Sequence, residues 1–335
     1  MRHAARRLLA WYDVHARALP WRSPPGGEPA DTYHVWLSEV MLQQTTVAAV
    51  TPRFTAWVAR WPTVEALAAA DEADVLGQWA GLGYYARARN LHAAARAVVA
   101  MGQFPRDESG LRDLPGIGDY TAAAIATIAF GRVAVPVDAN IARVGARLLG
   151  DDPSPATLRA RLVPLFAGRP GDVAQALMDV GSSICTSRAP ACYACPLADD
   201  CAAAAAGTPD RWPARKTKTP RPTRHGTVFW LEAGDHVLLV RRPPHGLLGG
   251  MASLPTSDWA EAVSDPLAQA PAPADWRILK ARVAHAFTHF HLDLGIARAE
   301  VRSRPDIAGE WVLVAGLDRA GLPTVFAKAA ALAQC

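Results

Sequence analysis

Residues 111–143, LRDLPGIGDYTAAAIATIAFGRVAVPVDANIAR, constrain the fold more than any other stretch of the chain. Pro115 ends one helical pattern, and Gly116 and Gly118 are expected to take the positive φ values that a tight turn needs. Asp119 is a suitable N-cap for the apolar helical pattern that follows. A turn between two helices presents free backbone N–H groups at a helix N-terminus, where phosphate binds without any long side chain.

A single carboxylate, Asp138, follows the apolar residues 135–137 and opens the next predicted helix. The segment would therefore hold phosphate at one end and place an acid at the other. Taken alone, Gly-x-Gly is a weak signal, and an ordinary helix–helix turn with a capping aspartate fits equally well. Motifs elsewhere in the chain are needed to distinguish a phosphate-binding turn from an ordinary one.

The 335 residues predict two domains, each large enough for its own core. With 50% hydrophobic and 20% charged residues, the composition is that of an ordinary globular protein. The net charge of +4 is small, so nucleic-acid binding would depend on local basic patches. No apolar run is as long as a membrane span, and the basic N-terminus lacks the apolar region of a signal peptide, so a cytoplasmic location is expected.

Four of the five cysteines, Cys185, Cys192, Cys195 and Cys201, lie within seventeen residues. An odd total of cysteines, with four of them clustered, indicates a metal site in a reducing compartment rather than a disulfide framework. Structural zinc sites usually pair two short Cys-x2–4-Cys units. The x6, x2, x5 spacing instead favours a four-thiolate iron–sulfur cluster, which we expect to serve the fold and the placement of DNA.

Glu39 lies in a strongly predicted helix with Val35, Trp36 and Leu42 at neighbouring positions and Gln43 one turn further along the same face. A carboxyl group among apolar side chains is costly to ionise, so its pKa should rise. A solvated surface glutamate is the commoner situation, but this face is too apolar for that interpretation. Glu39 is therefore a candidate catalytic acid.

The motif GLGYYARARNLH combines another glycine turn with a basic helix. Tyr84 and Tyr85, beside Arg87 and Arg89, could stack on bases or wedge between them. The same tyrosines would equally suit a protein core. Other helices are expected over residues 3–18, 33–46, 46–60, 63–70, 71–80, 139–149, 155–166 and 171–183. Residues 1–206 are thus predicted to be all-α.

The composition changes over residues 207–224, where six Lys/Arg and four prolines accompany one acid and predict an extended interdomain linker. Period-two patterns then predict a hairpin around a Gly-Asp turn, further strands and a closing helix, at residues 227–231 with 237–240, 281–301, 311–314 and 323–333. Residues 225–335 are therefore expected to form a small α/β domain.

Two segments of this second domain attract attention. PPHGLLGGMASLP is a glycine-rich loop, and Phe287-Thr288-His289-Phe290-His291 alternates polar and aromatic side chains. A lone histidine there would mean little, but two histidines and a threonine among aromatics could read the edge of a base.

Together these residues resemble one family, the MutY-type adenine DNA glycosylases of the helix-hairpin-helix superfamily, which includes endonuclease III. The matching motifs run in order across nearly the whole chain: LPWR (19–22), VWLSEVMLQQT (35–45), GLGYYARARNLH (81–92), LPGIG (114–118), VDAN (137–140), the four cysteines, RPPHGLLGG (242–250) and FTHFHLDL (287–294). The resemblance implies a multidomain protein, with an all-α helix-hairpin-helix glycosylase domain that carries a 4Fe–4S cluster loop and a smaller α/β Nudix-like domain that reads 8-oxoguanine. It also implies a monomer that flips adenine, mispaired with 8-oxoguanine or guanine, out of double-stranded DNA and removes it.

By this resemblance Glu39 protonates the departing adenine and then activates water, while Asp138 stays ionised and stabilises the oxocarbenium-like sugar or bonds to it. Bifunctional relatives carry a lysine where this chain has Tyr120, and a phenol cannot form the Schiff base that strand cleavage needs. Tyr120 is expected to hydrogen-bond near Asp138, with Asn140 and Arg22 beside the adenine pocket.

The DNA contacts implied by the resemblance fall into three groups. Phosphate would be bound by Gly116 and Gly118, the region around the gap in the helix contacted by Gln43, Gln44, Tyr84, Tyr85 and Arg87, and 8-oxoguanine read by Phe287, Thr288 and His289. Of the second group, Gln43, Gln44, Tyr84 and Tyr85 match the region that fills the gap, with Gln44 and Tyr84 the preferred wedge residues, and Arg87 is expected only to contact DNA beside them.

The chain departs from the family pattern at three places: Thr288, where serine is commoner; Ala139, where glycine often follows the aspartate; and Leu248, where tryptophan is common. The second domain also lacks a REx2E acidic cluster, so we expect it neither to bind metal nor to hydrolyse nucleotides.

Three other functions remain open. A bifunctional glycosylase/lyase for oxidised pyrimidines is opposed by Tyr120 and by the second domain. A non-catalytic iron–sulfur DNA-binding protein would be expected to lack Glu39 or Asp138. A zinc-bound regulator would lack the visible absorbance near about 400 nm that an iron–sulfur cluster gives.

Overall fold

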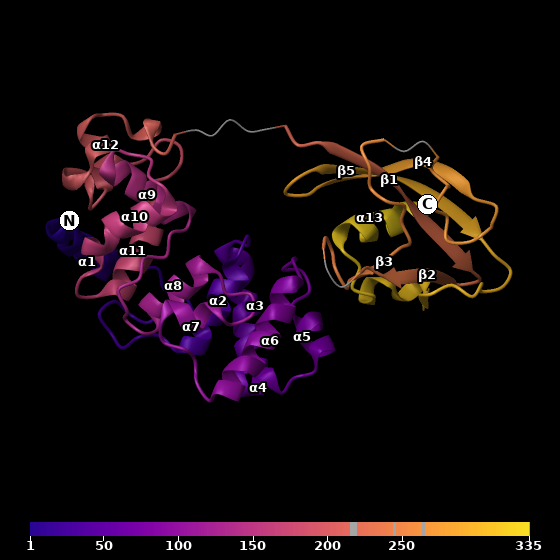
Figure 1. Ribbon diagram of the computed structural model, residues 1–335, viewed down its shortest axis with the longest axis horizontal. Helices are drawn as coiled ribbons and strands as arrows, with labels where there is room; N and C mark the ends of the chain where they lie inside the picture. The colour runs from indigo at the N-terminus through magenta and orange to yellow at the C-terminus, as the bar shows by residue number, and fades with distance from the viewer. Residues whose placement is uncertain (215–219, 244–245, 263–264, 335) are drawn as a thin grey trace. The chain divides into compact units, whose positions relative to one another are not determined.

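The computed structural model describes residues 1–214, 220–243, 246–262 and 265–334. It divides into two compact units, Met1–Lys216 and Thr217–Cys335, both drawn in Figure 1. Residues 215–219 of the predicted linker, Pro244 and His245 of the glycine-rich motif, and Cys335 lie outside the described residues. Among the residues that are described, no helix combines the length and the apolar character that a membrane span requires.

The first unit is helical. Its helices are α1 (Arg2–His15), α2 (Thr32–Leu42), α3 (Val47–Arg60), α4 (Val64–Ala68), α5 (Glu72–Gln78), α6 (Ala86–Met101), α7 (Glu108–Arg112), α8 (Asp119–Ile128), α9 (Ala139–Leu149), α10 (Pro155–Leu162), α11 (Pro170–Ser183) and α12 (Ala202–Ala205). Several begin where a side chain accepts a backbone N–H of the first turn, at Asp31, Thr46, Thr63, Asp71, Asp107, Asp138 and Ser154.

Helix α8 lies at the centre of this unit. Nearly all of its residues are buried, and it packs against α2, α7 and α11; Figure 1 shows it beside α2. Ala122, Ala123 and Ala124 let the neighbouring helices approach closely because they carry no bulk beyond Cβ. The turn before α8 is therefore fixed by a packed core.

The turn itself differs in two details from the prediction. Gly116 has the expected positive φ of 76°, and a Cβ there would lie 2.6 Å from the Cβ of Asn90. Gly118 has φ −96° and is the N-cap of α8, while Asp119 is the first helical residue. One residue in the left-handed conformation, Gly116, is enough to reverse the chain. Gly118 is therefore not needed for its backbone angle, and the space in front of the helix beside it is open.

Several predicted helices are shorter than expected; the one predicted over residues 155–166, for example, ends at Leu162. The helix predicted over residues 33–46 ends at Leu42, because the chain turns at Gln44, whose φ is 58°. The helix predicted over residues 3–18 ends at His15.

The second unit contains a mixed six-stranded sheet. Its strands are β1 (Thr223–Ala233), β2 (His236–Arg241), β3 (Ala252–Ser253), β4 (Arg277–Ala286), β5 (His291–Glu300) and β6 (Glu310–Leu313), followed by α13 (Thr324–Ala333). The order is β3-β2-β1-β5-β4, and β6 also pairs with β2. The β1–β5 pair is parallel and the others are antiparallel.

One face of this sheet is covered by α13. Phe326 and its neighbours on α13 pack with alternate residues of β1 and β5, such as Trp230 and Leu294. The predicted hairpin is confirmed, because Ala233 of β1 pairs with His236 of β2 across the Gly234-Asp235 turn.

Candidate active site

Glu39 is buried on α2, with 7% of its surface exposed. Burial raises the pKa of this carboxyl from its ordinary 4.5 to about 7; a hydrogen bond with Tyr120 and the charge of Arg22 lower it, and the charge of Asp138 raises it. The expected burial and raised pKa are therefore found, and a solvated surface glutamate is excluded. A carboxyl with such a pKa is substantially protonated at neutral pH, as general-acid chemistry requires.

Tyr120 stands in the first turn of α8, next to Glu39. Burial raises the pKa of Tyr120 well above its usual range, and the charges of Glu39 and Asp138 raise it further. Its phenol therefore stays protonated and can donate a hydrogen bond. The hydrogen bond is made with Glu39, and the phenol lies close enough to Asp138 for the charge of that carboxylate to act on it.

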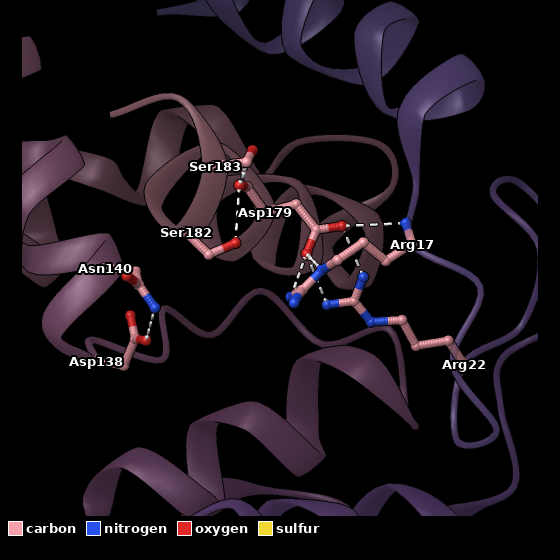
Figure 2. A network of polar contacts seen from close by, with 7 residues as sticks. All are labelled: Arg17, Arg22, Asp138, Asn140, Asp179, Ser182 and Ser183. Carbon is pink, nitrogen blue, oxygen red and sulfur yellow. Dashed lines mark hydrogen bonds and ion pairs between the residues drawn. The ribbon is translucent and has the colours of Figure 1, made fainter. Parts of the chain in front are cut away.

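Asp138 caps the N-terminus of α9. Its Oδ1 accepts the backbone N–H of Ile141 at 2.7 Å, and its Oδ2 accepts Nδ2 of Asn140 at 2.9 Å (Figure 2). Burial raises the pKa of Asp138, while these two hydrogen bonds lower it. The capping role and a chemical role do not exclude each other, because a carboxylate has lone pairs to spare.

Asn140 connects Asp138 to the cysteine loop. Its Oδ1 accepts Nη2 of Arg143 at 2.9 Å, and the same guanidinium donates to the carbonyl oxygens of Gly181 and Cys185, at 2.6 and 2.7 Å. Asn140 fits here only because position 181 is a glycine. A Cβ atom at Gly181 would lie 2.6 Å from the Cβ of Asn140, too close for any other residue. A continuous chain of hydrogen bonds thus joins Asp138 to the backbone of Cys185.

The four clustered cysteines line one cavity, together with Arg147. Nη1 of Arg147 lies 3.3 Å from Sγ of Cys185, and the arginine is 3% exposed. Within the described residues, no three ligand-type side chains are grouped so as to hold a single metal ion. Four soft sulfur ligands around a cavity, with a buried cation to offset their negative charge, fit an iron–sulfur cluster.

Arg22 lies in a second buried network, with a residue that the sequence did not single out. Asp179 of α11 accepts Nη1 and Nη2 of Arg22 at 2.7 and 3.1 Å, and Nε of Arg17 at 2.6 Å (Figure 2). Asp179 is only 1% exposed, so the two arginines compensate a charge that would otherwise be costly to bury. The signal in the sequence was the same as for Glu39, an acid within an apolar helical run, ALMDVG.

The preferred wedge residues occupy two exposed turns. Gln44 and Tyr84 are exposed and have positive φ, 58° and 49°. Gln43 instead points inward, where its Nε2 lies 3.3 Å from the hydroxyl of Thr121, and Tyr85 is half-buried. These contacts favour Gln44 and Tyr84 over their neighbours.

Arg87 is not placed for the direct DNA contact that was expected. Its guanidinium donates six hydrogen bonds to groups of the same unit, and burial lowers its pKa to about 10. Both terminal amino groups are occupied in this way, whereas Nε finds no hydrogen-bond partner among the described residues, so this arginine organises the backbone around it.

In the second unit, residues 287–290 form the tight turn between β4 and β5, closed by the N–H of Phe287 and the carbonyl of Phe290. Thr288 and His289 are exposed at its tip, whereas Phe287 packs beneath it. The ring of Phe287 stacks on Trp259 at a centroid distance of 5.8 Å. Trp259 was missed, because nothing in its local sequence distinguishes it from any core tryptophan.

Trp259 also joins this turn to the glycine-rich motif. The guanidinium of Arg242 lies 4.8 Å from the centroid of the Trp259 ring. Within the same motif Leu248 has a positive φ of 57°.

Comparisons with known proteins identify the kind of domain that each unit contains. Residues 37–165 match the HhH-GPD superfamily of base excision DNA repair proteins, and residues 227–332 match the NUDIX domain. A thermostable thymine-DNA glycosylase of known structure, 27% identical, aligns with a TM-score of 0.55 over 60% of this chain and 95% of its own. A trapped endonuclease III–DNA covalent intermediate, 22% identical, aligns with a TM-score of 0.51 and shows the shared fold.

Curated relatives narrow the family. The Homo sapiens adenine DNA glycosylase is 35% identical over 352 residues, which cover 85% of this chain and 64% of that protein. The chain spans 59 to 64% of the human, rat and mouse relatives. The Mycolicibacterium smegmatis adenine DNA glycosylase is 42% identical over 221 residues, which cover 63% of this chain and 73% of that protein. The chain therefore belongs to the adenine DNA glycosylase family, within the HhH-GPD superfamily of base excision DNA repair proteins.

Proposed function

We propose that this protein is a monofunctional glycosylase that removes adenine mispaired with 8-oxoguanine or guanine from double-stranded DNA. The observation that carries the proposal is the buried Glu39, with a pKa of about 7, hydrogen-bonded to Tyr120 and close enough to Asp138 to feel its charge. The family names of the relatives supply the substrate class, adenine in DNA.

In the proposed reaction the flipped adenine enters the helical unit between the two carboxyl groups. Neutral Glu39 donates its proton to the adenine ring as the N-glycosidic bond breaks, and the bonding electrons leave with the base. The sugar is left with oxocarbenium character, which the ionised Asp138 stabilises. The Glu39 carboxylate then takes a proton from the attacking water, which restores the starting state. Asn140 and the N-terminus of α9 hold the Asp138 carboxylate in place.

Tyr120 supports the monofunctional assignment. A phenol cannot attack the sugar to form an imine, and its raised pKa keeps it as a hydrogen-bond donor to Glu39. Arg22, held by Asp179, lies near the same carboxyl and would line the adenine pocket.

DNA would be bound through several parts of the chain. Backbone N–H groups at Gly116 and Gly118 would contact phosphate at the N-terminus of α8. Gln44 and Tyr84 would fill the gap left by the flipped base, and Thr288 and His289 would contact 8-oxoguanine. The enzyme would act as a monomer in the cytoplasm.

The cysteine loop would carry a 4Fe–4S cluster bound by Cys185, Cys192, Cys195 and Cys201. When bound, such a cluster would cross-link the loop through four thiolate bonds and contribute to the stability of the helical unit.

The test is single-turnover cleavage of a duplex with one adenine opposite 8-oxoguanine, analysed with and without hot alkali. Strand breaks that appear only after alkali are expected, because a monofunctional enzyme leaves an intact abasic strand. Breaks without alkali would point to the lyase activity that Tyr120 opposes. Binding of the duplex with no adenine release in either lane would favour a non-catalytic DNA-binding protein.

A further inference from the structure

Arg87, in the first turn of α6, caps the C-terminal end of the helix that carries Glu39. Its Nη1 donates to the carbonyl oxygens of Val40 and Met41, at 3.1 and 3.0 Å, and to that of Gln43 at 2.6 Å. Carbonyl groups at a helix C-terminus have no partner within the helix; a cation placed there donates hydrogen bonds to them and interacts favourably with the helix dipole. Arg87 thus fixes where α2 ends.

The second amino group of the same guanidinium holds a different loop. Nη2 donates to the carbonyl oxygens of Leu82 and Gly83, at 2.8 and 3.2 Å, and to the hydroxyl of Thr45 at 3.3 Å. The Gly83 carbonyl also accepts Nε1 of Trp79 at 2.9 Å. One partly buried side chain therefore ties together two loops that are 40 residues apart in the sequence, from residue 43 to residue 83.

The residues between these anchored groups are the two exposed tips. Gln44 lies between the held carbonyl of Gln43 and the held hydroxyl of Thr45, and Tyr84 directly follows the held Gly83. Both tips have left-handed backbone conformations. Such conformations are strained in a non-glycine residue and persist where the surroundings enforce them.

We propose that Arg87 is a positioning residue that holds Gln44 and Tyr84 at a fixed spacing, so that the two side chains enter the DNA as a paired wedge. The inference rests on the proposed function, because it assigns the placement of a wedge that the glycosylase needs. Arg87 itself does not contact DNA in this scheme.

Lysine cannot replace this arginine. An ammonium group has three N–H donors on a single nitrogen. The six hydrogen bonds of Arg87 come from two nitrogens of a planar guanidinium, which point in different directions. The guanidinium also faces the rings of Trp79 and Tyr84, at 5.1 and 5.6 Å from their centroids. The Arg87→Lys variant keeps the positive charge but can hold only one of the two loops.

The experiment compares two substrates for Arg87→Lys. One is a fully paired duplex with a single adenine opposite 8-oxoguanine, and the other places the same pair inside a short unpaired bubble, where no wedge is needed to extrude the base. We expect the single-turnover rate on the paired duplex to fall about 30-fold, since several charge-assisted hydrogen bonds are lost, and the rate on the bubble to fall less than about threefold. The matched control is Arg96→Lys on the same helix, an exposed arginine that should change neither rate.

A loss of rate that is equal on both substrates would overturn the proposal, because it would indicate general damage to the active site. An unchanged rate on the duplex would overturn it as well. If Arg87→Lys does not fold, Thr45→Val removes one of the anchoring contacts and should give the same selective loss on a smaller scale.

The activity of the wild-type protein distinguishes a failure of this inference from a failure of the proposed function. If the wild-type chain releases no adenine from either substrate, the proposed function fails. Fluorescence of 2-aminopurine at the adenine position of the bound duplex then tests Arg87 directly. Extrusion should be strong with wild type and weak with Arg87→Lys, and equal fluorescence would reject the positioning role.

Discussion

At the scale of single residues, Glu39 has opposite effects on stability and on the proposed reaction. Its pKa is 4.5 in an exposed chain and about 7 in the fold. The folded state therefore binds the proton more tightly, so this group's contribution to stability is fully present below pH 4.5 and is lost as the pH rises towards 7. The same shift keeps the acid protonated where the enzyme works, so the rate should fall as the pH rises above about 7.

The variant Glu39→Gln should remove both effects. Adenine release should be abolished, since an amide cannot donate the proton, while the free energy of unfolding at pH 8 should rise by about 3 kcal/mol over wild type. Denaturant unfolding at several pH values measures this gain, which should shrink towards zero near pH 4.5. Glu65→Gln is the control, because the pKa of this exposed carboxyl is lowered rather than raised. A gain that does not depend on pH would contradict the assignment of the raised pKa to Glu39.

Replacing Asp138 by asparagine separates its role as the N-cap of α9 from its proposed role in the reaction. Asparagine is as good an N-cap as aspartate, so Asp138→Asn should keep α9, with a small loss of stability because its amide NH2 cannot accept the hydrogen bond from Asn140. Adenine release should fall by at least about 1,000-fold, because a neutral amide stabilises the sugar cation poorly, while binding of the mismatched duplex should remain. Single-turnover assays and binding isotherms measure the two properties. Wild-type rates in this variant would remove Asp138 from the reaction.

At the scale of helices and strands, the sequence pattern predicted most elements but not their ends or their partners. The apolar helix around Glu39 and the hairpin of β1 and β2 follow from periodicity and turn residues. The end of α2 at Leu42 does not, because it is set by Arg87, which approaches from a distant helix. Likewise, the acid at position 179 was visible in the sequence, but its pairing with Arg17 and Arg22 depends on how α11 packs against the N-terminal segment.

Gly181 tests the packing of α9 against α11. In an exposed helix position, glycine to alanine stabilises by about 0.5–1 kcal/mol, and Gly77→Ala in α5, where a Cβ would have nothing within 4 Å, should show this gain. Gly181→Ala should instead destabilise the protein and reduce adenine release about tenfold or more, because the new methyl group displaces Asn140 from Asp138. Thermal melts and single-turnover rates report both effects. A stabilised and fully active Gly181→Ala protein would show that Asn140 has room to move.

At the scale of the whole molecule, the two units are expected to divide the work between bond cleavage and recognition of the opposite base. Glu39 and Asp138 belong to the helical unit, whereas Thr288 and His289 are at the tip of a turn in the other. A change that loosens only this turn should therefore alter the choice of substrate and leave the chemical step intact.

Trp259 offers such a change, because its ring supports the turn from below through Phe287 and also contacts Arg242. Trp259→Ala should reduce the preference for adenine opposite 8-oxoguanine over adenine opposite guanine by about tenfold, the value of one good base contact. The rate on the guanine mispair at saturating enzyme should stay the same. Trp276→Ala is the matched control, since it removes an equal ring that packs against Phe229 in the same unit. If both variants lost the preference equally, general destabilisation of the sheet would explain the result; if neither did, the turn would read the base without support from Trp259.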